Sequence, residues 1–116
     1  MLSLELPWPP SINHYWRHTK NGHYISEEGK DYRQLVFFHC LKHKNKFTKE
    51  DRISVHIQAH PPDRRKRDLD NVLKALLDSL QHGGIYNDDS QIDRLSISRH
   101  LPLEGKVHIM LDVISD

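Results

Sequence analysis

The sequence predicts a single α+β domain, a two-layer sandwich in which a mixed β-sheet carries two main helices packed on one face. Three observations support this fold class. The chain has 116 residues, about the size of one domain. Four segments alternate apolar and polar residues as strands do, and two segments repeat apolar residues at helical spacing. Their order, strand, helix, strand, helix, strand, strand, favours a sheet with both helices on one side. We therefore expect one domain over residues 1–116.

The first half of the chain contains one strand and one helix. Its first seven residues alternate leucine with polar residues, which predicts a half-buried strand ended by a proline cluster. Residues 11–25 are rich in aromatic and basic side chains and are typical of a long loop or an irregular hairpin. Ser26, followed by two glutamates, predicts the start of a helix over about residues 27–44. One face of this helix should carry Tyr32, Leu35, Val36, His39 and Cys40, and its apolar band is unusually wide because Phe37, Phe38 and Leu41 lie outside that face.

The second half adds three strands and a second helix. Residues 53–60 alternate apolar and polar side chains, which predicts a strand that ends at the following prolines. From Leu69 to Leu80, apolar residues follow the i, i+3, i+4 rule for three turns, and two glycines then stop the helix. Two more strands are expected around Leu95 and over residues 107–113, joined by a turn that contains proline and glycine.

Composition excludes several classes of protein. No stretch approaches the roughly 18 to 20 apolar residues that a membrane-spanning helix needs, and the first thirty residues lack a signal-peptide pattern. The single cysteine, Cys40, excludes an internal disulfide, and there is no Cys-x-x-Cys pair for zinc or redox chemistry. We therefore expect a cytoplasmic protein that has no membrane partner and no small-molecule cofactor.

Charge is distributed unevenly along the chain, although the net charge is only +1. Residues 14–67 hold thirteen lysines and arginines against six acidic residues, whereas residues 68–116 hold four against nine. A basic segment joined to an acidic one fits a protein that binds a polyanion with one surface and a cation with another. The alternative is that ordinary solvated charges fell unevenly.

The most informative stretch joins four basic residues to two carboxylates. Arg64, Arg65, Lys66 and Arg67 lie between a predicted strand and a predicted helix, where extended backbone can present guanidinium groups to phosphates. Taken alone, such a run is more often a solvated loop. The acidic residues that follow it make a binding function more probable.

Asp68 lies where a helix N-cap belongs, and Asp70 lies in the first turn, away from the leucine stripe. Lys74 is one turn along from Asp70, and Asn71 adds a carboxamide to the same region. Two carboxylates at this spacing suit Mg²⁺, or Mn²⁺ as a substitute, because hard cations take oxygen ligands and retain waters. Asp88 or Asp89 can supply a third carboxylate if the chain folds back toward the helix start. Each of these acids can instead be structural, as a cap, a dipole partner or part of a turn.

Histidine offers a competing metal site. His39 and His43 have the i, i+4 spacing of a helical ligand pair, but no glutamate lies between them to act as a base. The sequence also shows no glycine-rich phosphate loop and no nucleophile elbow. The carboxylate site is therefore the favoured interpretation.

Three motifs in order resemble the RusA-type Holliday junction resolvases, which are found in bacteria, phages and prophages. They are Leu6-Pro-Trp-Pro-Pro-Ser11 with Asn13, Tyr15, Arg17 and His18; Pro62-Asp-Arg-Arg-Lys-Arg-Asp-Leu-Asp-Asn71 with Lys74; and Asn87-Asp-Asp89. Lys66, in a run that is often all arginine, and Ile12, at a position that is sometimes polar, are small departures from the family pattern. The resemblance implies a catalytic set of Asp68, Asp70, Asp89 and Lys74, with the three aspartates holding Mg²⁺.

The resemblance further implies a homodimer that resolves four-way DNA junctions by paired symmetric nicks, in recombination and repair. DNA contacts are expected from Arg64, Arg65, Lys66, Arg67, Arg17, Lys20 and Asn71, and Tyr15 and Trp16 are candidates for stacking on an unpaired base. Two alternatives remain open: a non-catalytic nucleic-acid-binding module and a less selective nuclease of branched DNA. The role of Lys74 also stays open, as does whether Asp89 serves its own subunit or its partner.

Overall fold

The computed structural model describes residues 1–44 and 46–115. Its strands are β1 (Leu2–Pro7), β2 (Trp16–Thr19), β3 (Gly22–Ile25), β4 (Ile53–His60), β5 (Ile92–Arg99) and β6 (Lys106–Val113). Its helices are α1 (Ile12–Tyr15), α2 (Glu27–Cys40) and α3 (Asp70–His82), with short 3-10 turns η1 (Leu41–His43) and η2 (Asp89–Gln91). None of the described helices is long and apolar enough to span a membrane.

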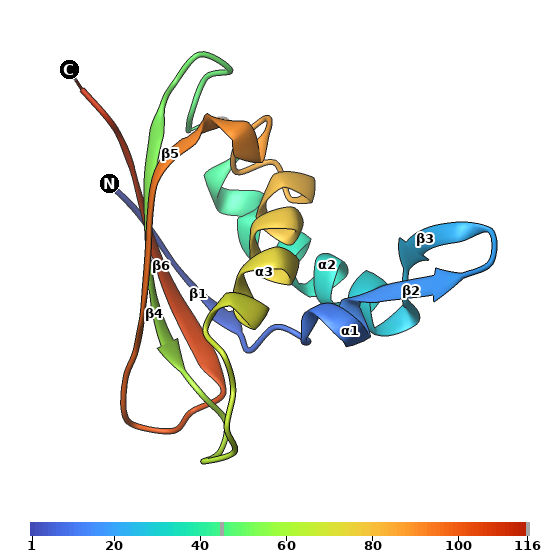
Figure 1. The fold of residues 1–116 in the computed structure, drawn as a ribbon. Coiled ribbons are helices and arrows are strands. Elements are labelled where there is room, and N and C mark those ends of the chain that lie inside the picture. Colours follow the sequence, from blue (N-terminus) through green and yellow to red (C-terminus); the bar gives the residue numbers. More distant parts are fainter. Residues whose placement is uncertain (45, 116) are drawn as a thin grey trace.

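The four long strands form one mixed sheet in the order β1-β6-β4-β5. β6 is antiparallel to both of its neighbours, whereas β4 and β5 are parallel. Helices α2 and α3 lie on one side of this sheet, and no other element covers its opposite face in the described chain (Figure 1). The predicted two-layer α+β fold is therefore confirmed.

Alternating residues of the central strands build the core between sheet and helices. The side chains that face inward are almost fully excluded from water: they include Leu4 and Leu6 of β1, Val55 and Ile57 of β4, and Ile109 and Leu111 of β6. They meet apolar residues of both helices, such as Val36, Leu76 and Leu80. Since burying a side chain of this size contributes roughly 1.5–3 kcal/mol, this layer makes a firm platform for the loops at its edges.

Helix α3 connects the two parallel strands, as a βαβ connection requires. Its N-terminus therefore follows the C-terminal end of β4, and the basic residues 64–67 lie in the intervening loop. The expected N-cap at Asp68 is wrong: Leu69 is the N-cap residue, no side chain caps it, and its backbone is already helical. The chain enters α3 through a turn in which the backbone N–H of Asn71 donates to the carbonyl of Asp68 (3.2 Å). The Asp68 side chain is consequently left outside the helix cap.

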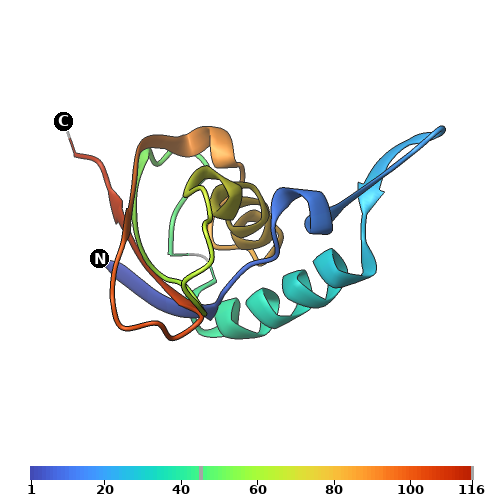
Figure 2. The ribbon, with the colours of Figure 1, turned by 60° about the horizontal axis from the view of Figure 1, so that its bottom comes forward.

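Residues 11–25 form a short helix and a hairpin, where the sequence predicted a loop or irregular hairpin. β2 and β3 pair in antiparallel fashion and project from the body of the molecule (Figures 1 and 2). Gly22 adopts φ +124° at the turn, a conformation that L side chains rarely adopt. The hairpin reaches away from the sheet and so extends the span of the protein.

Helix α2 begins as predicted and ends earlier. The Ser26 hydroxyl accepts a hydrogen bond from the backbone N–H of Gly29 at 2.9 Å, which confirms the expected cap. The helix stops at Cys40, and a 3-10 turn follows, so the predicted extension to residue 44 is wrong. Leu35 is 51% exposed rather than buried, because only a narrow stripe of α2 faces the core at this edge of the molecule.

Candidate active site

The basic loop is held in shape by Asp63. One oxygen of this carboxylate accepts hydrogen bonds from Nη1 of Arg67 (2.6 Å) and from the backbone N–H of Arg65 (2.9 Å). The Arg67 hydrogen bond, followed by the bond from the Arg65 backbone, lowers the pKa of Asp63 to about 2. The Arg67 guanidinium also lies 6.0 Å from the centre of the Trp8 ring. The Arg67 side chain therefore helps to hold the loop in shape, although part of it is still exposed to solvent.

Arg64 and Lys66 differ from Arg67 because their side chains are exposed and form no ion pair among the described residues. Arg65 contacts Asp63 only at 3.4 Å and is 83% exposed along its side chain. The loop therefore presents at least these three cations to an incoming anion. Phosphate groups of a nucleic acid are the anions that such a run binds.

Asp68 and Asp70 follow this loop directly at the beginning of α3. Both residues are exposed, and neither carboxylate forms an ion pair within the described parts of the chain. The helix N-terminus, with its unpaired N–H groups, favours negative charge at this place. Lys74 is exposed one helical turn after Asp70, and Asn71 is half-buried between them. The predicted carboxylate, carboxamide and ammonium groups are therefore together on one end of α3.

Asp89 is not brought to this end of the helix. Its backbone N–H donates to Oε1 of Gln81 (2.9 Å), near the C-terminus of α3. Gln81 is eleven residues after Asp70, a distance of about 16 Å along a helix axis. Accordingly, no group of three His, Cys, Asp or Glu residues in the described chain is arranged to hold a metal ion. The expectation that this turn folds back toward the helix start is wrong for a single chain.

The reason is the buried side chain of Gln91, which fixes the η2 turn elsewhere. Its Oε1 accepts from the backbone N–H groups of Asn87 (2.9 Å) and Asp88 (3.1 Å), and its Nε2 donates to the carbonyls of Thr48 and Asp51 (both 2.9 Å). The Asp88 carboxylate accepts from the backbone N–H of Ser90, and this bond lowers the pKa of Asp88. The turn is therefore tied to the loop before β4, and sequence spacing gave no sign of this contact.

The donor set at the start of α3 nevertheless fits a divalent cation. Mg²⁺ commonly uses one or two protein carboxylates and completes its octahedron with waters and substrate phosphates. Asp68 and Asp70 supply two hard oxygen donors beside a phosphate-binding loop. The competing pair His39 and His43 is separated by the end of α2, and His43 already belongs to the η1 turn.

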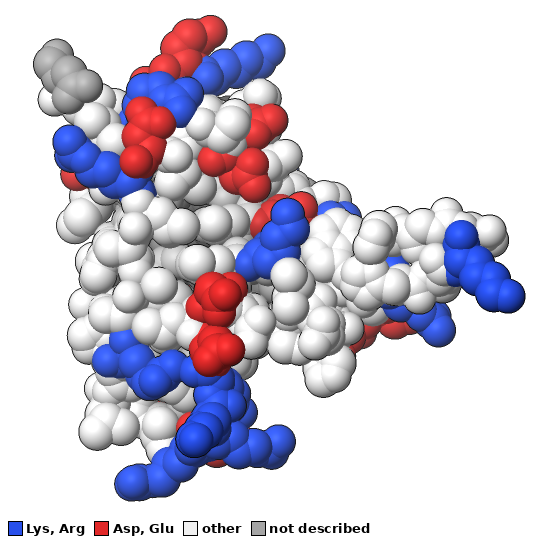
Figure 3. Space-filling model, in the orientation of Figure 1, with Lys and Arg blue, Asp and Glu red and all other residues white. Residues whose placement is uncertain are grey.

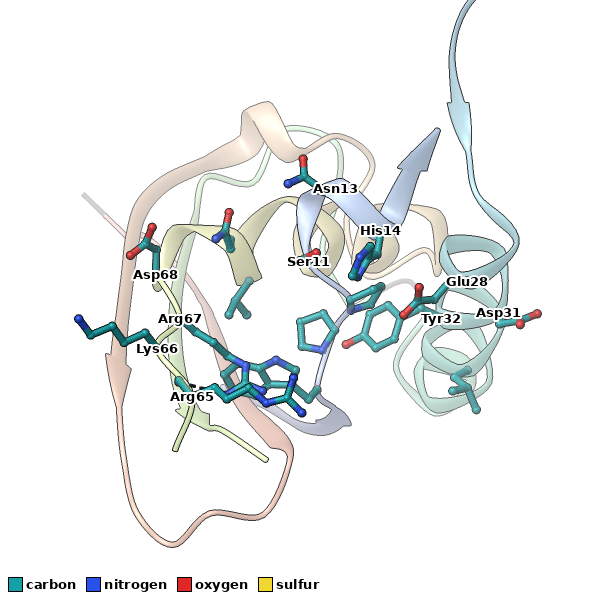
Figure 4. A pocket seen from close by; sticks show the side chains of 16 residues that line it. Ser11, Asn13, His14, Glu28, Asp31, Tyr32, Arg65, Lys66, Arg67 and Asp68 are labelled. Atoms are coloured by element: carbon teal, nitrogen blue, oxygen red, sulfur yellow. Dashed lines mark hydrogen bonds between the residues drawn. The ribbon is translucent and has the colours of Figure 1, made fainter. Parts of the chain in front are cut away.

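A groove of about 880 Å³ opens between the basic loop and α2 (Figure 4). One side carries Arg65, Lys66, Arg67 and Asp68, and the other carries Glu28, Asp31 and Tyr32 of α2, with Trp8, Pro9 and Pro10 between them. Ser11, Asn13 and His14 close it from the α1 side (Figure 4). The α2 side of the groove and the role of Asp63 were not predicted from the sequence. The i, i+4 spacing of Asp63 and Arg67 was the available signal for the latter.

Two predicted DNA contacts, Arg17 and Lys20, belong to the projecting hairpin region and lie apart from the basic loop. Tyr15 is fully buried, so the prediction that it stacks on an unpaired base is wrong. Its hydroxyl instead contacts Asp78, which pairs with Arg33 at 2.6 Å. Burial and the Asp78 contact both raise the pKa of Tyr15. This half-buried network anchors the base of the hairpin to both main helices.

Comparison with known proteins gives one consistent result. Residues 7–112 match the family model of endodeoxyribonuclease RusA. The chain is 42% identical over 100 residues to the crossover junction endodeoxyribonuclease of Enterobacteria phage HK97, covering 86% of this chain and 83% of the relative. It is 41% identical over 90 residues to the enzyme of that name from Shigella sonnei strain Ss046, covering 78% and 75% of the two chains. The chain therefore belongs to the RusA endodeoxyribonuclease family.

Proposed function

We propose that this protein is a divalent-metal-dependent endonuclease that resolves four-way DNA junctions by paired nicks, in recombination and repair. Its relatives carry the name crossover junction endodeoxyribonuclease. The observation that carries the proposal is that the basic loop continues directly into Asp68, which lines the groove, and Asp70, which begins α3 two residues later. Phosphate binding and metal binding are thereby joined at one place on the surface.

In this proposal the chain's own residues position the scissile phosphate. Arg64, Arg65 and Lys66 hold the DNA backbone without reading bases, and Asn71 adds a polar contact beside the helix start. Asp68 and Asp70 would hold Mg²⁺, or Mn²⁺ in its place. Such an ion would supply Lewis-acid chemistry, making a water nucleophile more acidic and offsetting negative charge on the phosphate. Lys74 then stabilises developing negative charge or orients the attacking water from one turn away.

The active form is proposed to be a homodimer. Two symmetry-related nicks need two sites, and each chain carries one cluster of Asp68 and Asp70. The third carboxylate, Asp89, is held away from that cluster by the four hydrogen bonds of Gln91. Because the η2 turn is fixed, entry of Asp89 from a second copy is favoured over movement within one chain. Nicking of one junction strand, restored by mixing the Asp70→Asn and Asp89→Asn proteins, would support this arrangement, because each mixed dimer would then have one intact site; no activity in the mixture would contradict it.

The exposed apolar surface at the C-terminal end of α2 and the start of η1 is the candidate dimer contact. Phe38 is 72% exposed and Leu41 is 49% exposed, which is unusual for side chains of this size. A Phe38→Glu variant should sediment as a monomer at micromolar concentration if this face is the contact. A dimer of unchanged stability would place the contact elsewhere.

The decisive experiment compares binding and cleavage for the Asp70→Asn protein. It should bind a four-way junction in EDTA as tightly as the wild type or more tightly, because a carboxylate near phosphates repels them, and it should not cut in Mg²⁺. Asp112→Asn, a change of the same chemistry at an exposed site on β6, is the matched control and should cut normally. Cleavage by Asp70→Asn near the wild-type rate would remove Asp70 from the site.

The same assay separates the alternatives. Binding of the wild-type protein to the junction without any Mg²⁺-dependent cut would favour a non-catalytic binding module. Cutting of flaps and Y-forks as readily as junctions would favour a less selective nuclease.

A further inference from the structure

A second hollow, of about 400 Å³, lies beside the basic loop and is distinct from the groove described above. It shares Arg65, Lys66 and Arg67 with the groove. Pro61, Asp63 and Arg64, from the same loop after β4, also line it, and its opposite wall comes from the end of β5 and the β5–β6 connection. Arg99, His100 and Leu101 belong to that wall, whereas no residue of α1 or α2 does. The basic loop is therefore a ridge with a hollow on each side.

The wall is fixed to the end of β4 and to the loop by hydrogen bonds. The backbone N–H of His100 donates to the carbonyl of Ala59 (2.8 Å), and that of Gly105 donates to the carbonyl of Pro61 (3.3 Å). The Arg99 guanidinium donates to the carbonyl of Arg67. These contacts hold the β5–β6 connection against the ridge, so the hollow is part of the folded structure.

Its charge is strongly positive and largely uncompensated. The single carboxylate in the lining, Asp63, is already paired with Arg67 and Arg65. Arg64, Lys66 and Arg99 form no ion pair with a carboxylate among the residues that the structure describes. Figure 3 shows lysine and arginine side chains gathered at the lower end of the molecule, where this loop lies. The hollow is suited to an anion larger than a single carboxylate.

We propose that this hollow binds the phosphate backbone of a second DNA segment, separate from the segment held in the groove. The inference rests on the proposed function and deepens it. A ridge of cations between two hollows can lie between two adjacent DNA arms and contact the phosphate backbone of each. A four-way junction has such adjacent arms, whereas a duplex is a single arm. Arg99 and His100 then serve junction binding specifically. The ridge residues Arg65 and Lys66 serve both segments.

The test measures affinity for a labelled four-way junction and for a matched duplex in EDTA at several salt concentrations. Arg99→Gln should weaken junction binding by about tenfold and lower its salt slope by about one unit, as expected for one lost phosphate contact. Leu101→Glu places a negative charge in the hollow at a side chain that is 76% exposed and should weaken junction binding as well. Duplex affinity should change by less than twofold in both variants. Thermal unfolding of each variant checks that its fold is intact.

Arg94→Gln is the matched control, because Arg94 is exposed on the same strand and lines neither hollow. It should leave both affinities unchanged. Equal losses of junction and duplex binding in Arg99→Gln and Leu101→Glu would overturn the proposal in favour of one continuous duplex surface. Unchanged junction binding in both would show that the hollow does not contact DNA. Failure of the wild type to cut junctions in Mg²⁺ would instead refute the nuclease proposal. The junction and duplex affinities measured in EDTA would still test the hollow.

Discussion

Gly29, in the first turn of α2, lies so close to the start of the hairpin that one added methyl group should destabilise the protein. A Cβ atom there would lie 2.5 Å from the carbonyl oxygen of Tyr15 and 2.7 Å from Cγ1 of Ile25. Ordinary contacts between such atoms are about 3.5–4.0 Å. The Tyr15 carbonyl has little room to move, because it accepts hydrogen bonds from the backbone N–H (2.9 Å) and the hydroxyl (3.0 Å) of Ser26. Gly29→Ala must therefore push α1 and α2 apart.

The size of the effect follows from three terms. Overpacking costs about 1–3 kcal/mol. Weakening of the two Ser26 hydrogen bonds costs up to about 0.5–1.5 kcal/mol each. In the opposite direction, alanine stabilises the helix by about 1 kcal/mol relative to glycine because of its higher helix propensity. The free energy of unfolding should fall by about 1–5 kcal/mol, and Tm should fall by roughly 4 °C for each kcal/mol.

Thermal and urea unfolding, followed by circular dichroism, measure this change. Lys30→Ala is the control, because Lys30 is exposed in the next position of the same helix and its ion pair with Glu27 is a surface pair at 3.5 Å. Its stability should stay within about 0.5 kcal/mol of the wild type. A Gly29→Ala protein that is as stable as the wild type, or more stable, would refute the reasoning. Replacing a helical glycine by alanine has that effect where there is open space around the glycine.

Four further predictions concern single side chains. Lys74→Met should slow Mg²⁺-dependent cleavage by at least about 100-fold and leave junction binding in EDTA close to wild type, as single-turnover and gel-shift assays would show. Arg65→Ala should lower the salt slope of DNA binding by about one unit in a titration. Arg67 lowers the pKa of Asp63 to about 2, so ionised Asp63 stabilises the fold above pH 4. This contribution is lost as the pH falls toward 2. The urea midpoints measured at pH 5 and pH 2.5 should therefore differ less in Asp63→Asn than in the wild type. Burial raises the pKa of Cys40 to about 11, so a thiol reagent at pH 8 should modify it only in denaturant.

The regular elements could be predicted because their signals are local. The alternation in β1, β4 and β6 and the leucine stripe of α3 are read directly from neighbouring residues, and each is found where expected. The Ser26 cap is local too, since its hydroxyl bonds the third residue after it. Each of these features depends on residues within a few positions of one another.

The features that could not be predicted from the sequence depend on contacts between distant segments. Tyr15 looked available for stacking, yet it is buried against Asp78, sixty-three positions away. The η2 turn looked free to approach the start of α3, yet Gln91 fixes it to Thr48 and Asp51. Leu35 has the spacing of a core residue, but α2 lies at the edge of the helical layer and leaves it exposed. The periodicity of apolar residues does not show which helix lies at the edge of the helical layer. It also does not show which loop a buried side-chain amide bonds to.

The position of β6 within the sheet determines when the protein can fold. This strand is synthesised after the other five described strands, yet it lies between β1 and β4 and pairs with both. Leu2 of β1 pairs with Leu111, so β1 has no neighbour in the sheet until β6 has been made. Closing so long a loop costs entropy before any pairing contributes, which makes folding slow relative to a helical bundle of this size. We therefore expect the nascent chain to remain unfolded on the ribosome until β6 emerges, with the sheet assembling in one late cooperative step.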